Sequence, residues 1–236
     1  MPTFQVPPII PFSASTSSGV FMAKRVREKN VDRIGNLPDA ILSHILSFVT
    51  TKQAVRTSIL STRWRYLFAL VPNLDFQLDY GNFPSWKKPK SSTIKSFESF
   101  VDRVLFFHNS IEKFCLKCEK GFDSSRVCGW ISAALWRGVQ HLDLTIFILN
   151  FTTLPGVLFT CRTLVTLKLN IYFVLNVPND VCFPNLKTLY LRSIEFQNDD
   201  SVKRLFSNCV SLEDMVIEDC YFWNISNFNI SHHFLK

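Results

Sequence analysis

Cysteine and histidine are the residues of this sequence that could bind a metal ion or act as catalytic groups, and their spacing limits which of these roles is available to them. Cys115 and Cys118 form a C-x-x-C pair, a spacing with which two thiolates can ligate one zinc ion. Cys128 is the next cysteine, and no second C-x-x-C pair follows it. Since a structural zinc site usually needs four ligands, the pattern favours buried structural thiols. We therefore predict no metal site and no cofactor.

The histidine and acidic residues do not form a recognisable catalytic pattern. His108 and His141 lack the motif-bound serine or cysteine that a nucleophilic triad requires. Asp199 and Asp200 are adjacent, which is typical of a solvated turn or helix start rather than a catalytic dyad. No glycine-rich phosphate loop or dinucleotide fingerprint occurs. We therefore predict that the protein is not an enzyme.

Composition and charge restrict the classes of partner. The 236 residues are 47% hydrophobic, enough for one large core or for a small module plus a larger domain. The net charge of +7 includes +3 from residues 1–30, so the remainder is nearly balanced and indicates no nucleic-acid-binding patch. No apolar run approaches the roughly 20 residues that cross a bilayer, so no membrane partner is expected.

The cysteines and the N-terminal segment bear on localisation. Seven irregularly spaced cysteines and no visible secretory signal predict free thiols in the nucleus and/or cytoplasm. Residues 1–30 are expected to form a disordered leader, because four prolines and a serine-rich stretch discourage helix. Residues 1–21 could be an upstream extension, since Met22 begins a more conventional start.

The first secondary-structure elements expected along the chain are three short helices within residues 31–78. An apolar stripe recurs at helical spacing in the first helix. Thr50 or Thr51 is suited to cap the second helix, and Ser61 the third. A module this short buries too little surface to be stable alone, so we expect it to lean on a partner or a neighbouring domain. The residues of the stripe are Ile41, Leu42, Ile45, Leu46 and Val49.

The C-terminal half is repetitive. After a linker and an amphipathic helix in residues 79–110, a pattern with apolar residues at its first, fourth and sixth positions recurs in residues 111–236. Its units start 22 to 28 residues apart, in or near the range of leucine-rich repeats. The fourth and sixth positions point to one face of a strand, and stacked units bury a shared core. The units are Ile111–Phe114–Leu116, Val139–Leu142–Leu144, Leu164–Leu167–Leu169, Leu186–Leu189–Leu191 and Leu212–Met215–Ile217.

These residues resemble a known family. The string LPDAILSHILSFVTTKQAVRTSILSTRWRYLF is similar to the F-box of plant F-box/leucine-rich-repeat proteins, including FBD-type relatives. Segments such as LPGVLFTCRTLVTLKL and FPNLKTLYLRSIEF are similar to the repeats of that family, so the resemblance covers residues 31–222. It implies an α+β to α/β fold: a small three-helix F-box, then an irregular leucine-rich-repeat solenoid with a curved parallel sheet and helices on its convex side. It also implies a chain shorter than related proteins, as if truncated.

The resemblance further implies partners and site residues. The F-box would bind a Skp-type adaptor, and through it a cullin, in a ubiquitin ligase complex that acts in the ubiquitin-like conjugation pathway. Some matched residues would contact the adaptor and others would hold the helices together, and Trp64 is open between these roles. Thr62 and Phe68 depart mildly from the family pattern. The matched residues are Leu37, Pro38, Ile41, Leu42, Ile45, Leu46, Val55, Leu60, Ser61 and Trp64.

The expected function is substrate recognition in such a ligase, with an unknown protein target bound by the repeats. The protein would have no catalytic residue of its own and would act by holding a target near the ubiquitin carrier. The alternative is a non-degradative scaffold, or a competitor of longer relatives.

Overall fold

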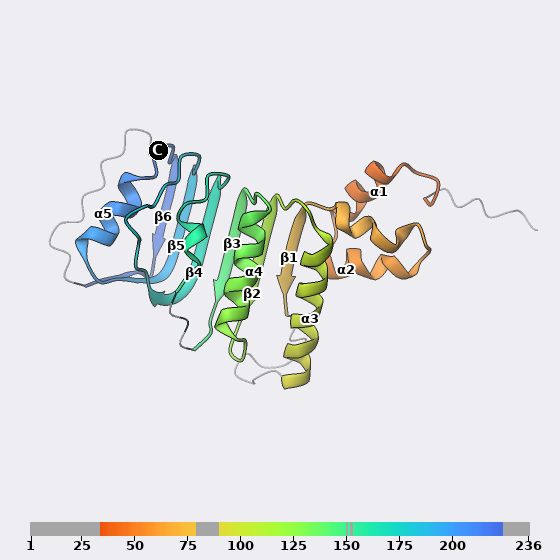
Figure 1. The fold of residues 1–236 in the computed structure, drawn as a ribbon, viewed down its shortest axis with the longest axis horizontal. Coiled ribbons are helices and arrows are strands. Elements are labelled where there is room, and N and C mark those ends of the chain that lie inside the picture. The colour runs from red at the N-terminus through yellow and green to blue at the C-terminus, as the bar shows by residue number, and fades with distance from the viewer. Residues whose placement is uncertain (1–33, 79–89, 150, 152, 224–236) are drawn as a thin grey trace, which may run out of the picture. The chain divides into compact units, whose positions relative to one another are not determined.

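The structure, a computed structural model, describes residues 34–78, 90–149, 151 and 153–223 (Figure 1). The leader expected in residues 1–30 lies outside the described residues. The helices, with 3-10 helices labelled η, are α1 (Asp39–Leu46), α2 (Thr51–Arg56), η1 (Thr57–Ile59), η2 (Trp64–Leu70), α3 (Ser91–Phe107), α4 (Ser124–Trp136), η3 (Gly156–Leu158) and α5 (Asp199–Ser207). The strands are β1 (Asn73–Gln77), β2 (Lys113–Cys118), β3 (His141–Ile146), β4 (Thr166–Val174), β5 (Thr188–Phe196), β6 (Asp214–Glu218) and β7 (Tyr221–Phe222).

Of the helix caps predicted for the N-terminal helices, only the one for α2 is confirmed. Thr50 caps α2 with a capping box: its hydroxyl accepts from the Gln53 N–H (3.3 Å), and the Gln53 side chain accepts from the Thr50 N–H (3.1 Å). The predicted cap at Ser61 is wrong. The third helix, η2, begins at Trp64, and Arg63 precedes it with no side-chain cap. Ser61 therefore lies too early in the chain to cap the helix.

The strands form one parallel sheet in the order β1 to β6, and β7 pairs with β5. The register aligns the repeat pattern across strands, because Phe114 pairs with Leu142, Leu142 with Leu167, and Leu167 with Leu189. Each of these side chains is at most 2% exposed. The predicted stacking of leucine-rich units is therefore confirmed.

The first strand belongs to this sheet and not to the helical module. Leu74 and Phe76 of β1 lie opposite Phe114 and Leu116 of β2, and all four side chains are buried. Both residues lie within residues 31–78, predicted to contain the F-box, and they also match the repeat pattern in a shorter form. A hydrogen bond from the Asp75 N–H to Thr51 Oγ1 (2.7 Å) also joins β1 to α2. The helical module therefore leans on the first strand of the repeats.

Helices α3 and α4 lie over one face of the sheet (Figure 1). Their apolar sides pack into a core shared with the strands, and Phe97 of α3 meets Phe122 and Trp130 edge-on. Connections between later strands are shorter, with η3 after β3 and α5 after β5. The repeats are therefore irregular, as expected. No helix of the described residues is long and apolar enough to span a bilayer.

Candidate functional site

Helix α1 has two apolar faces, one buried in the core and one exposed to solvent. Leu42 and Leu46 are 0% and 3% exposed and pack with Trp64 in the core of the helical module. Ile41 and Ile45, one position earlier in each case, are 47% and 43% exposed. The single stripe read from the sequence is therefore divided into a core face and a solvent face.

Arg63 fastens the start of α1. Its Nε and Nη2 atoms donate to Asp39 Oδ1 at 3.1 and 2.8 Å, and its guanidinium also donates to the carbonyl oxygens of Gly35 and Leu37. The planar guanidinium suits this, since it presents several donors in one rigid fork. Arg63 thereby holds the Leu-Pro segment against the start of the third helix. Arg63 was not among the site residues predicted from the sequence.

The ten residues predicted to bind the adaptor differ in how deeply they are buried in the structure. Trp64, which the sequence left open between two roles, is 9% exposed and belongs to the core. Direct contact with a partner is therefore available chiefly to the exposed members. Exposed are Pro38, Ile41, Ile45, Leu60 and Ser61, half-buried are Leu37 and Val55, and buried are Leu42, Leu46 and Trp64.

Two further exposed apolar side chains of the F-box were not among the residues predicted from the sequence. Phe48 is 75% exposed and follows Ile41 and Ile45 at the spacing of one helical face. Ile59, in η1, is 88% exposed. The signal for Phe48 was available, because it extends the i, i+4, i+7 series from Ile41. We name Ile41, Ile45, Phe48 and Leu60 the apolar F-box surface, and Ile59 lines a groove between the F-box helices and α3.

A second surface is the side of the sheet whose residues alternate with the buried ones. Its middle row runs across five neighbouring strands in register, from Asp75 through Cys115, Asp143 and Lys168 to Tyr190. None of these five side chains is buried, whereas the alternating positions are. We call this side the open face, and it presents mainly polar and charged groups.

Burial shapes the electrostatics of the open face. Desolvation raises the pKa of Asp143 above its ordinary value, and Asp75 adds to the rise while Lys168 and Lys113 oppose it. Desolvation also raises the pKa of Cys115 to about 11, with Asp143 adding to the effect. A thiol with such a pKa is neutral near pH 7 and is a poor nucleophile.

At the far end of the sheet the open face holds a charged cluster. Tyr190 Oη donates to Glu218 Oε2 at 2.5 Å, and Arg192 Nε donates to Asp219 Oδ2 at 3.2 Å. The hydrogen bond to Glu218 raises the pKa of Tyr190. These exposed pairs hold long side chains in place, although such pairs contribute little stability. The cluster thus offers an ordered polar surface to a partner.

The chemistry of the remaining sequence candidates is structural. Cys115 faces the open side of β2 and Cys118 is buried on the other side, so the two thiols of the C-x-x-C pair diverge. Nδ1 of His141 lies 3.1 Å from Thr166 Oγ1 on the neighbouring strand. Asp199 and Asp200 occupy the first turn of α5, where Asn198 is the cap. His108 is 1% exposed, and its ring nitrogens lie 2.7 and 3.2 Å from the carbonyl oxygens of Val104 and Val71.

Comparison with known families agrees with this division of the chain. The F-box domain profile matches residues 34–75, which contain the apolar F-box surface. The profile described as "FBD-associated F-box protein At5g56370, LRR repeats" matches residues 127–236, which contain strands β3 to β7.

Curated relatives from Arabidopsis thaliana match across both parts. F-box/LRR-repeat protein At4g14103 is 41% identical over 208 residues, covering 84% of this chain and 53% of the relative. F-box protein At3g59000 is 45% identical over 215 residues, covering 87% and 43%. F-box/LRR-repeat protein At4g14096 is 44% identical over 191 residues, covering 80% and 40%. The chain spans about half, or less, of the length of these relatives. With an F-box, a parallel leucine-rich-repeat sheet and relatives of both descriptions, this chain belongs to the plant F-box/leucine-rich-repeat family.

Proposed function

We propose that the chain is the substrate-recognition subunit of an SCF-type cullin-RING ubiquitin ligase. The F-box would bind a Skp-type adaptor, and through it a cullin, while the open face of the repeats would receive a protein target. In this role the chain performs no bond chemistry itself. It would raise the local concentration of a target lysine near the ubiquitin carrier.

The observation that carries the proposal is the apolar F-box surface. Large apolar side chains gathered and exposed on a small helical module mark a protein-binding surface. Ile41 and Ile45 share one side of α1 and Phe48 lies in the turn after its end, while the core of the module is already filled by Leu42 and Leu46. The exposed set is thus not needed to fold the module, and burial against a partner would remove it from water.

The open face supports the second half of the proposal. Its residues come from consecutive strands in register, so neighbouring repeats present their side chains as rows. Carboxylates, lysines, an arginine and a tyrosine lie on it. This mixture suits a polar protein surface rather than an apolar ligand, because charged groups across an interface select partners by complementarity.

The first test is co-purification of the full chain with a plant Skp-type adaptor, comparing the wild type with Ile45→Asp. A charge at the centre of the apolar F-box surface should weaken binding by roughly 30-fold to 1,000-fold, which corresponds to about 2–4 kcal/mol at an interface hot spot. Val210→Asp is the matched control, because Val210 is 59% exposed and lies between α5 and β6. It should bind as the wild type does.

Circular dichroism must show that the Ile45→Asp chain is still folded. Leu42→Ala provides the contrast, because it should impair binding only together with loss of helical structure. Equal binding by the wild type and a folded Ile45→Asp chain would remove this surface from the adaptor interface. If the adaptor binds but cellular partners of the chain gain no ubiquitin in an adaptor-dependent way, the non-degradative scaffold replaces the ligase role.

A further inference from the structure

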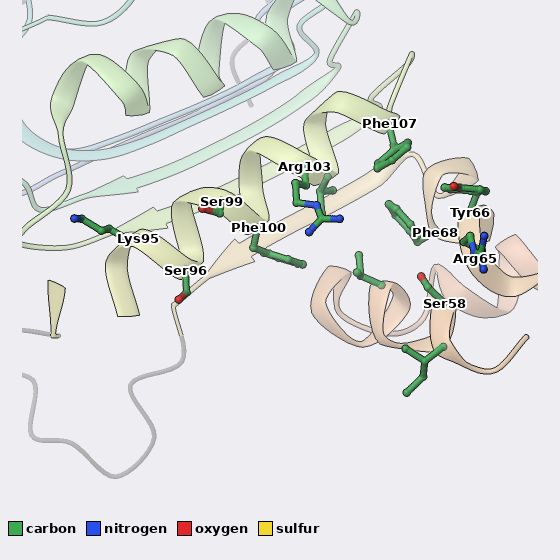
Figure 2. A pocket seen from close by; sticks show the side chains of 13 residues that line it. Ser58, Arg65, Tyr66, Phe68, Lys95, Ser96, Ser99, Phe100, Arg103 and Phe107 are labelled. Atoms are coloured by element: carbon green, nitrogen blue, oxygen red, sulfur yellow. The ribbon is translucent and has the colours of Figure 1, made fainter. Parts of the chain in front are cut away.

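A groove lies between the F-box helices and α3, beside the apolar F-box surface (Figure 2). Its volume is about 790 Å³. In Figure 2 the Arg103 and Phe100 side chains project from α3 toward the F-box helices, and Phe68, Tyr66 and Phe107 gather at one end. Neither the core of the helical module nor that of the repeats fills this space. We refer to it as the basic groove.

Three cations line the groove. Arg65, Lys95 and Arg103 line it, and no aspartate or glutamate among the described residues does. None of the three has a carboxylate partner within the described part of the chain. Three like charges around one hollow with low-dielectric walls produce a positive potential that attracts anionic groups.

Nearby carboxylates are occupied elsewhere. Glu98 and Asp102 of α3 both pair with Arg126 of α4, at 3.1 and 2.8 Å. Asp39 of the F-box pairs with Arg63 at 2.8 Å. The acids of α3 therefore turn toward α4, and Arg103 projects toward the groove (Figure 2), whereas Lys95 also lines a second hollow with Glu98 and Asp123. The positive charge of the groove therefore has no neutralising partner among these side chains.

Aromatic rings form an apolar shelf beside the cations. Phe68 and Phe107 meet edge-on with their centroids 5.8 Å apart, and Tyr66 lies 5.5 Å from Phe107. Phe107 is 37% exposed and Tyr66 is 55% exposed, so the shelf can be reached by a ligand. Exposed rings of this kind accept aliphatic or aromatic side chains and are common anchors in protein interfaces.

The length of the groove suits a short extended peptide. Lys95 and Phe107 both line it and lie on the same helix. At 1.5 Å per residue their separation along α3 is about 18 Å, which roughly five or six extended residues would span. Ser58 supplies a further polar group at the F-box wall, where its hydroxyl has no hydrogen-bond partner among the described residues. A small rotation of this side chain would allow it to bond to a ligand.

We propose that the basic groove binds an acidic peptide segment of a partner protein, with carboxylates toward Arg65, Lys95 and Arg103 and one apolar side chain on the aromatic shelf. Arginine favours this chemistry, because its guanidinium can bond a carboxylate through two parallel N–H groups. The proposal goes beyond the adaptor surface and does not depend on it, since binding can be measured on the chain alone.

The test is fluorescence anisotropy of the full chain with a labelled eight-residue peptide of aspartate and glutamate that carries one phenylalanine and one leucine. Arg65→Glu combined with Arg103→Glu should weaken binding by about tenfold or more, because two attractive contacts become repulsive. Arg162→Glu combined with Lys203→Glu is the control, since it changes the net charge equally at exposed sites outside the groove. This control and Ile45→Asp should bind as the wild type does.

Two further probes distinguish other occupants. A peptide with asparagine and glutamine in place of the acids should bind about tenfold more weakly, and higher salt should weaken the acidic peptide. Equal loss in the groove and control variants would overturn the proposal, as would equal binding of the neutral peptide. Binding of inorganic tripolyphosphate without peptide binding would assign the groove to a free anion instead. If the double reversal fails to fold, Arg103→Gln alone should still weaken the acidic peptide and leave the neutral one unchanged.

Discussion

Single residues decide which face of the F-box is core and which is exposed to solvent. Ile41 and Leu42 are adjacent and chemically similar, yet Leu42 is fully buried and Ile41 is 47% exposed. A helix turns by about 100° per residue, so one position is enough to move a side chain from the core to solvent. Substitutions in this module therefore have to be interpreted by burial and not by residue type alone.

Asp143 is the residue with the clearest pH signature on the open face. Desolvation dominates the rise in its pKa, so the folded state binds this proton more tightly than the unfolded chain does. Ionisation of Asp143 therefore costs stability. The cost is absent below the ordinary carboxyl pKa and develops as the pH rises through the raised value in the folded protein.

Asp143→Asn should consequently raise the free energy of unfolding at pH 7, because it removes a half-buried charge while keeping a similar shape. The gain should shrink as the pH falls below the ordinary carboxyl pKa of about 4, where the wild-type carboxyl becomes protonated in both states. Urea unfolding at several pH values measures this. Asp214→Asn, at an exposed position in β6, should show no such dependence. A stability difference that stays constant across the pH range would contradict the explanation.

At the scale of elements, the C-terminal end of α4 is stabilised by a conspicuous set of contacts. The Arg137 guanidinium donates to the carbonyl oxygens of His108 (2.7 Å), Ala133 (2.7 Å) and Leu105 (3.2 Å). These carbonyls lie at the ends of α3 and α4, where helices leave acceptors unsatisfied and favour positive charge. Arg137 therefore ties the two helices that cover the first strands.

Two glycines of this region should respond oppositely to alanine. Gly138 ends α4 with a φ of +78°, so Gly138→Ala should lower stability by about 1 kcal/mol through backbone strain. Gly129 is inside α4, is exposed, and has no atom within 4 Å of an added Cβ. Gly129→Ala should raise stability by roughly 0.5–1 kcal/mol, because alanine is the better helix former. Thermal or urea unfolding of both variants tests the pair, and a shift of the same sign in each would refute it.

At the scale of the whole molecule, the repeats are stable only as a stack. Each of the strands β2 to β5 shares its buried row with the strands on both sides, so no unit encloses its own core. Leu167 lies in the middle of that row, between Leu142 and Leu189, and is 2% exposed. A defect there affects the contacts of two neighbouring units.

Leu167→Ala should therefore lower the free energy of unfolding by about 2–5 kcal/mol through the cavity that it leaves. Lys168→Arg is the matched control, because it changes the next residue of β4 on the open face, keeps the positive charge near Asp143, and should shift the free energy of unfolding by no more than about 0.5 kcal/mol. Denaturant unfolding followed by circular dichroism measures both. Similar losses in the two variants would show that the alternation of buried and open positions is misassigned.

Much of the architecture could be read from the sequence, because it rests on local periodicity. The paired apolar positions of each repeat predicted strands with one buried face, and Phe114, Leu142, Leu167 and Leu189 do align across the sheet. The helical spacing of apolar residues likewise predicted α3 and α4. The F-box motif, with Leu-Pro, the helical stripe and the Arg-Trp-Arg segment in order, already resembles that of the family. These features depend on the order of residues along the chain, which the sequence states directly.

The proposed binding surfaces could not be predicted in the same way, because they depend on distances between residues that are far apart in the chain. Sequence periodicity could not show that Leu46 is buried and Ile45 exposed. The apolar stripe of the helix is wide enough to cover both faces, so it appears in the sequence as one continuous stripe. The contact of Arg63 with Asp39, and the position of Arg65 and Arg103 around a groove that no carboxylate of the described residues lines, follow from how helices pack after folding. The sequence by itself determined the elements, their order and their apolar faces. Only the tertiary structure decided which charges are paired and which apolar groups remain in water, because both depend on neighbours brought together in space.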